Sequence, residues 1–126
     1  MCWMCDDPSR TRADLRAWQV ATIAEHGWLL QFVEADDRQP SLVYTVGLTA
    51  FGKAELVASG LTVADGADLN DVAAGYLSGE IRAGDTVMVG RHQYRLVPDH
   101  DTSGLYTAID LYGRHIRALG LRRRRR

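Results

Sequence analysis

The sequence predicts an α+β fold, in which a single domain has a mainly antiparallel sheet of five or six strands and two principal helices. Three observations lead to this prediction. Residues 42–48 alternate with the period of a β-strand, and residues 69–77 repeat apolar side chains at helical spacing. Two short β-rich runs flank a Gly-Arg turn at residues 90–91, which is the pattern of a hairpin. A chain of 126 residues suits one domain with one modest core.

The composition is that of an ordinary globular protein, with 46% hydrophobic and 25% charged residues. No apolar run approaches the ~20 residues needed to cross a bilayer. The N-terminus also lacks the basic and apolar segments of a signal peptide. We therefore expect a cytoplasmic protein with no membrane partner. The net charge of −1 is unevenly spread, because without the five terminal arginines residues 1–121 carry −6.

The first helix is expected to run from about Arg12 to His26. Thr11 can cap its N-terminus, with Asp14 in the first turn, and Gly27 can end it in a left-handed conformation. A broad face of mostly small side chains should pack on the sheet, and it comprises Ala13, Ala17, Val20, Ala21, Ile23 and Ala24.

Two larger apolar side chains of this helix, Leu15 and Trp18, fall outside that face. We expect the N-terminal segment, residues 1–11, to fold back over them. A partner surface is the alternative, and a second copy of the chain in a homodimer would also cover them. In either case the predicted domain comprises residues 1–121.

The next two strands are predicted at residues 28–34 and 42–48, joined by a polar turn at residues 35–40 as an antiparallel hairpin. One face of the second strand should carry Leu42, Tyr44, Val46 and Leu48, and the other Val43, Thr45 and Gly47. Both faces are apolar or small, so we expect a central strand covered on both sides. A loop at residues 49–53 then leads to a third strand at residues 55–59.

The second helix has the clearest pattern in the chain. Thr62 and Asp65 form a capping pair before it. Five apolar residues then follow at helical spacing, namely Leu69, Val72, Ala73, Tyr76 and Leu77. The helix is expected to end near Ser78 and Gly79.

The C-terminal third begins with a predicted hairpin whose strands are residues 86–89 and 93–97, stopped by Pro98. The spacing of apolar residues from 105 to 112 fits a short helix, but part of this segment can also be interpreted as a strand. Residues 115–119 could form a last strand.

Tyr44, Thr45 and Gly47 are the candidate ligand-binding residues. A glycine inside a strand often marks a bulge, or the close approach of a second backbone or a ligand. Thr45 is the one polar side chain on the same face. The first functional hypothesis is therefore a non-enzymatic module that binds a small ligand or a protein through residues 44–48.

The second hypothesis is an enzyme, hydrolase-like or of another kind, with a histidine acid or base near that strand. His100 lies between Asp99 and Asp101, which could tune a base. Adjacent loop residues rarely converge on one point, however, so a solvated turn is the simpler interpretation. His26 is expected to interact with the carbonyls at the end of the first helix. The sequence contains no Gly-x-Ser-x-Gly, Walker or Rossmann pattern.

Cys2 and Cys5 have the spacing of half a tetrahedral zinc site. A full site would need two more ligands, and the four histidines show no paired spacing. A redox dithiol is a further alternative, although the acidic residues that follow disfavour a reactive thiolate. Two thiols packed beside tryptophan side chains are the simplest interpretation, so we expect no cofactor.

The C-terminus consists of Arg122, Arg123, Arg124, Arg125 and Arg126. A run of like charges cannot pack into a core, so residues 122–126 are expected to be a disordered tail. Five guanidinium groups can bind RNA or DNA without sequence specificity. A nucleic-acid or ribosome accessory protein that acts weakly through this tail is the third hypothesis. We expect no basic face elsewhere in the chain to assist it, and the tail could instead pair with the acidic body.

Several segments together resemble a known family. They are the Met-Cys-Trp-Met-Cys-Asp start, His26-Gly27-Trp28, Tyr44-Thr45-Val46-Gly47-Leu48, Glu55-Leu56-Val57 and Leu111-Tyr112-Gly113. With them the chain is similar to the DUF4262 proteins, which are small bacterial, mainly actinobacterial, proteins of unestablished function. The resemblance covers nearly the whole chain and implies this fold, but it implies no reaction.

The chain departs from the family pattern at several positions. Family members often carry His-Pro where this chain has Asp7-Pro8, and again where it has Lys53-Ala54. Their last strand often ends in a Trp-rich segment with a glutamine, whereas here Leu119-Gly120-Leu121 precedes the arginines. Any chemical role of those histidines is therefore not transferred to this chain.

Overall fold

The computed structural model describes residue 9 and residues 11–124. In this part of the chain the elements are α1 (Arg12–His26), β1 (Leu29–Val33), β2 (Leu42–Val46), the 3₁₀ helix η1 (Leu48–Phe51), β3 (Glu55–Ser59), the 3₁₀ helix η2 (Val63–Asp65), α2 (Gly66–Ser78), β4 (Thr86–Val89), β5 (His92–Asp99), α3 (Tyr106–Tyr112) and β6 (Ala118–Arg123). The predicted α+β fold is confirmed, with α1 and α2 as the two long helices.

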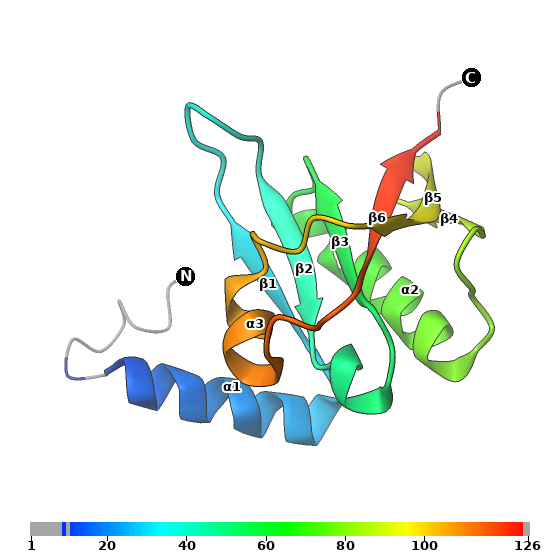
Figure 1. Cartoon of the computed structure of the whole chain (residues 1–126). Helices are drawn as coiled ribbons and strands as arrows, with labels where there is room; N and C mark the ends of the chain where they lie inside the picture. The colour runs from blue at the N-terminus through cyan, green and yellow to red at the C-terminus, as the bar shows by residue number, and fades with distance from the viewer. Residues whose placement is uncertain (1–8, 10, 125–126) are drawn as a thin grey trace.

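The six strands form one sheet in the order β1-β2-β3-β6-β5-β4 (Figure 1). All neighbouring pairs are antiparallel except β3 and β6, which run parallel. Helices α1 and α3 lie on one face of the sheet and α2 lies on the other. Each face therefore has its own apolar core, and β2 contributes to both of them, as expected for a covered strand.

Helix α1 has the predicted bounds and the capping box formed by Thr11 and Asp14, but the prediction of its packing face is wrong. Gln19 is its buried residue, and Ile23 packs against the core. The small side chains that were expected to pack are exposed, namely Ala13, Ala17, Val20, Ala21 and Ala24.

Polar contacts explain the orientation of α1. The Arg16 guanidinium donates to Gln19 Oε1 at 2.6 Å and to Asp110 Oδ2 at 2.7 Å, which links α1 to α3. Gln19 in turn donates to Gln31 Oε1 on β1 at 3.5 Å. Leu15 on this helix is partly buried, whereas Trp18 is 44% exposed. The predicted cover for these two, residues 1–8 with Arg10, lies outside the described residues.

Strand β2 ends two residues earlier than predicted. The chain leaves the sheet at Gly47, whose φ is 137°, and continues as η1, where a loop was expected. Leu48 therefore packs in the α2-side core with Val43, and the prediction that it shares a face with Tyr44 is wrong. The predicted hairpin with β1 is confirmed, with Leu29 opposite Val46.

Strand β5 continues through Pro98 to Asp99, so the prediction that the proline stops it is wrong. Pairing with β4 ends at Arg95, whereas pairing with β6 continues, and Pro98 lies opposite Leu119. Beyond Arg95 the edge of β5 that faces away from β6 has no neighbouring strand in the described part of the chain. The missing N–H of Pro98 therefore interrupts no ladder, and the proline is tolerated there.

The C-terminal segment resolves the ambiguity at residues 105–112 in favour of a helix, α3. The last strand, β6, starts later than predicted and includes Arg122 and Arg123, which pair with Arg95 and Tyr94. The prediction that residues 122–126 form a disordered tail is therefore wrong for these two arginines. Arg125 and Arg126 lie outside the described residues.

The packing of α1 can be tested with two β-branched residues of the same helix. Ile23 contacts the core and Val20 is 50% exposed. We expect Ile23→Ala to lower the free energy of unfolding by about 1–2 kcal/mol, less than at a fully buried site. Val20→Ala should change it by less than ~0.5 kcal/mol, because alanine also favours the helix. Urea denaturation of both variants measures this, and a larger loss for Val20→Ala would reverse the assignment of faces.

Candidate functional site

A buried carboxylate lies at the point where β2, η1 and β3 meet. Glu55 is fully buried at the start of β3. Its two oxygens accept hydrogen bonds from Thr45 Oγ1 at 2.8 Å, from the backbone N–H groups of Gly47 at 3.3 Å, Leu48 at 3.1 Å and Thr49 at 2.9 Å, and from the Thr49 hydroxyl. We call this arrangement the Glu55 cage.

The cage satisfies the N-terminus of η1. The first N–H groups of a helix have no partner within it, and they favour negative charge. The Glu55 carboxylate gives these N–H groups an acceptor. In return, backbone and hydroxyl donors stabilise the carboxylate, and none of its described hydrogen bonds comes from a cationic side chain. Nearby, burial and then repulsion from the Glu55 carboxylate raise the pKa of the Tyr112 phenol.

Gly47 is required by close packing at the cage. A Cβ at this residue would lie 2.5 Å from the carbonyl oxygen of Gly27 and 2.8 Å from Cα of Trp28, and the φ of 137° disfavours other residues. The sequence left a bulge, a second backbone and a ligand open at this glycine, and the structure shows the close approach of a backbone. The approaching segment is the link between α1 and β1.

The predicted ligand-binding residues lie together, but the structure buries them. Tyr44 is 1% exposed and its hydroxyl accepts from the Thr107 N–H at 3.1 Å. Thr45 is fully buried, and its hydroxyl donates to Glu55 and accepts from the Leu56 N–H at 2.8 Å. These polar groups serve internal hydrogen bonds, so this geometry does not support a ligand site at Tyr44, Thr45 and Gly47.

The histidines are spread over the molecule. His26 is exposed at the end of α1, 3.8 Å from Glu25, and His100 and His115 are exposed. Near His100 the carboxylates serve the turn instead of the imidazole. Asp101 accepts from the N–H and hydroxyl of Ser103, and these bonds, the side-chain one first, lower the pKa of Asp101.

The described residues also contain no group of three or more His, Cys, Asp or Glu that could hold a metal ion. Cys2 and Cys5 lie outside them. Within the same part of the chain, no helix has the length and apolar character of a membrane span.

A basic surface forms on the half of the sheet that α1 and α3 leave uncovered. Arg95 on β5 lies directly opposite Arg122 on β6, and Arg124 follows two residues later on the same face. All three side chains are exposed, and we call them the arginine face. The body, residues 1–121, contributes Arg95 to this face, and the other two arginines belong to the terminal run that starts at Arg122.

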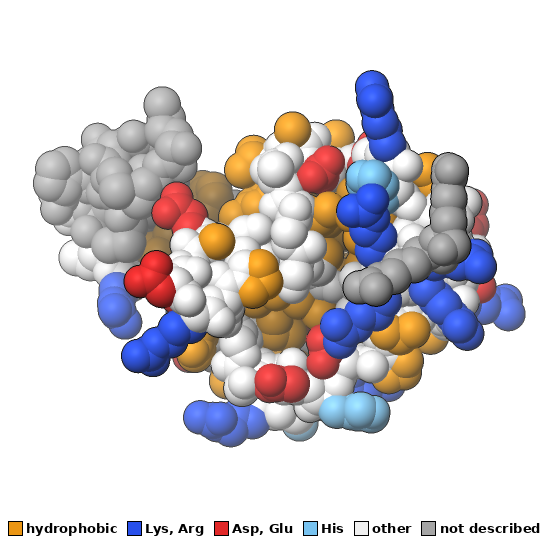
Figure 2. Space-filling model, turned by 90° about the horizontal axis from the view of Figure 1, so that it is seen from above, with side chains coloured by type: hydrophobic (Ala, Val, Ile, Leu, Met, Phe, Trp, Pro, Cys, Tyr) orange, Lys and Arg blue, Asp and Glu red, His pale blue; other side chains and the backbone are white. Residues whose placement is uncertain are grey.

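Little negative charge offsets the arginine face. Among the described ion pairs, the face takes part in the one between Arg122 and Asp99, in which Nη2 of the arginine lies 3.8 Å from Oδ2 of the aspartate. Thr86, Met88 and Gln93 complete the exposed strip beside the arginines. In Figure 2 several Lys and Arg side chains gather on the right of the view, and further ones lie at the lower left.

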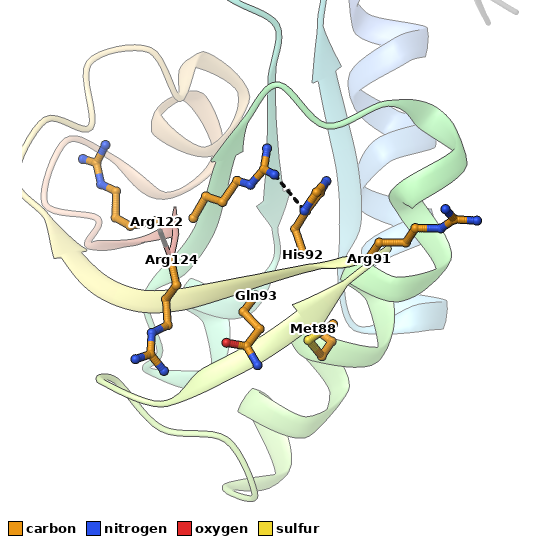
Figure 3. Close-up of a pocket in the computed structure, with 7 residues that line it drawn as sticks. Met88, Arg91, His92, Gln93, Arg122 and Arg124 are labelled. Carbon is orange, nitrogen blue, oxygen red and sulfur yellow. Dashed lines mark hydrogen bonds between the residues drawn. The ribbon is translucent and has the colours of Figure 1, made fainter. Parts of the chain in front are cut away.

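Arg123 follows Arg122 on β6, so its side chain lies on the other face of the sheet. It contacts His92, as the dashed line in Figure 3 marks. Its Nη2 lies 2.8 Å from His92 Nδ1. An arginine nitrogen can only donate, so His92 Nδ1 is the acceptor in this contact. Around this contact the end of the sheet is hollowed by about 1010 Å³, lined by Met88, Arg91, His92, Gln93, Arg122, Arg123 and Arg124. The described lining thus contains four arginines and no carboxylate.

The Glu55 cage can be tested by Glu55→Gln, with Glu80→Gln as the exposed control. An amide nitrogen in place of one oxygen would face N–H donors, so we expect a loss of about 3 kcal/mol or more in the free energy of unfolding. Glu80→Gln should change it by less than ~0.5 kcal/mol.

A second measurement separates lost charge from altered packing. Alkaline titration of Tyr112 absorbance should show a lower phenol pKa in Glu55→Gln, because the repulsion that raises it has gone. Equal stability of the two glutamine variants, or an unchanged titration of Tyr112, would contradict an ionised Glu55.

Comparison with known proteins identifies the chain without assigning an activity to it. No curated protein and no solved structure matches it. Residues 22–121 match the family described as "Domain of unknown function (DUF4262)". This range contains the Glu55 cage with both segments that form it, as well as α2 and the β4–β5 hairpin. The match spans most of the sequence, and the chain therefore belongs to the DUF4262 family.

Proposed function

We propose that the protein is a non-enzymatic module that binds nucleic acid through its arginine face. The observation that carries the proposal is the position of Arg95 directly opposite Arg122 in the sheet. Like charges at directly opposite positions destabilise a sheet, and Arg124 adds a third guanidinium to the same face. Such an arrangement becomes favourable when an anion lies across it.

The chemistry of guanidinium groups favours nucleic acid as that anion. Guanidinium groups bind phosphate bidentately and can stack on unpaired bases. The strip of Thr86, Met88 and Gln93 beside the arginines adds polar and polarisable side chains to an open strand surface. These features support a single-stranded ligand laid across β4, β5 and β6, bound with little sequence preference.

This proposal relocates the binding module expected from the sequence. Tyr44 and Thr45 are buried, so a ligand would need to displace their internal hydrogen bonds before reaching them. The arginine face is exposed and needs no such rearrangement. A cytoplasmic location, where RNA is accessible, fits the same proposal.

The test is fluorescence anisotropy of a labelled single-stranded RNA titrated with the protein at several salt concentrations. Arg95→Gln with Arg124→Gln removes two guanidinium groups from the face. We expect weaker binding for this variant, and a log–log salt slope shallower by about 1.4, since each lost contact with a single strand removes ~0.7.

The matched control is Arg12→Gln with Arg38→Gln, which removes the same charge from α1 and from the β1–β2 turn. The strands β1 and β2 lie at the edge of the sheet opposite β4 and β5. Both residues are exposed. The control should bind like the parent protein. If both double variants lose affinity equally, binding reflects net charge alone and the arginine face is not the site.

A further inference from the structure

The sheet divides between its two parallel strands. β3 and β6 pair over three positions, which end with Val57 opposite Gly120. Beyond that point each strand stays paired with its other neighbour, as Ser59 with Leu42 and Arg123 with Tyr94. Figure 1 shows the ends of β3 and β6 pointing apart. The carboxyl ends of the two strands therefore form the walls of a cleft.

The cleft opens through the sheet, because its lining comes from both faces. It has a volume of about 330 Å³, and its lining includes Ser59, Gly60, Asp99, Gly120, Arg122 and Arg123. This volume lies in the range of small-ligand sites. Gly60 is exposed and a Cβ there would meet no atom within 4 Å, whereas Gly120 is buried beneath the side chains of Asp99 and Arg122.

The backbone alternation turns N–H groups of both walls into the cleft, together with the C=O groups of the same residues. Gly60 N–H donates to Ser41 on the β2 side, so the N–H of Ser59 turns towards β6. Arg124 N–H donates to Gln93 on the β5 side, so the N–H of Arg123 turns towards β3. Both N–H groups lie beyond the end of the β3–β6 ladder. Ser59, Arg122 and Arg123 also line the cleft. Their hydroxyl and guanidinium groups can donate as well, once Arg123 leaves its contact with His92.

We propose that this cleft binds a phosphate monoester, either the terminal phosphate of a nucleic-acid strand or that of a mononucleotide. A monoester presents three terminal oxygens, enough to meet donors from both walls, whereas a backbone diester presents only two. Facing N–H groups and arginines form anion sites, and ligands of open sheets bind beyond the carboxyl ends of strands. An entering phosphate replaces Asp99 as the partner of Arg122, which is now 3.8 Å away.

If the phosphate is the end of a nucleic-acid strand, this inference rests on the proposed function, because the arginine face would hold the rest of that nucleic acid. Arg122 lies in both the face and the cleft lining. A strand that crosses β4, β5 and β6 can therefore end between β6 and β3. The mononucleotide as source needs only the cleft.

The experiment compares two single-stranded RNAs of one sequence, labelled at the 3′ end, with either a 5′-phosphate or a 5′-hydroxyl. We expect the phosphorylated strand to bind about tenfold more tightly, equivalent to ~1.4 kcal/mol. Ser59→Ala with Arg123→Gln should reduce this ratio to about one. Arg95→Gln with Arg124→Gln should weaken both strands and keep the ratio, which separates the cleft from the face.

A second arm uses ¹H–¹⁵N correlation spectra of the protein with adenosine monophosphate, and with adenosine as the control. The amides of Ser59 and Arg123 should shift with the nucleotide and not with the nucleoside. If RNA does not bind but these amides shift, the cleft site stands with a nucleotide as its ligand, and the proposed function fails. If both RNAs bind equally and the amides do not shift, the cleft inference is overturned and the proposed function stands.

Discussion

The fold depends on one buried negative charge. Glu55 begins β3, and its carboxylate connects this strand to the end of β2 and to the start of η1. Its own N–H donates to the Arg117 carbonyl at 2.9 Å, just before β6. The Leu56 N–H donates to the Thr45 hydroxyl instead of a backbone carbonyl of β2. The regular β2–β3 ladder therefore ends at the preceding pair, Tyr44 and Val57. A single residue thus sets the register of three strands, because an ionised carboxylate without its donors would be far too costly to bury.

The cage joins two of the segments on which the resemblance to the family was based. Residues 44–48 and residues 55–57 are separate in the sequence and form its two halves. The donors must come from a strand that turns at a glycine, and the acceptor must come from the first residue of the next strand. A pattern fixed by such an interaction identifies a fold, and it therefore carries no information about a ligand. In this chain the basic features lie at the opposite end of the sheet.

The accuracy of prediction followed the kind of interaction that positions each element. Helix α2 was predicted well because apolar burial sets its face, with Leu69 and Ala73 in the core. Helix α1 was oriented wrongly because Arg16 and Gln19, which anchor it, carry no hydrophobic signal. The arginine face was missed because Arg95 and Arg122 become neighbours only through the β5–β6 register. Glu55 left one signal, a charged residue at the start of an otherwise apolar strand.

The position of β6 between β3 and β5 has a consequence for how the protein is made. Until residues 118–123 have left the ribosome, β1-β2-β3 and the β4–β5 hairpin cannot belong to one sheet, because no other strand joins them. In addition to the edges at β1 and β4, the nascent chain then exposes the edges of β3 and β5, which can pair with other chains. Strand β6 covers the edges of β3 and β5 at once. Its arginines place repulsive charge beside these edges at the moment of closure.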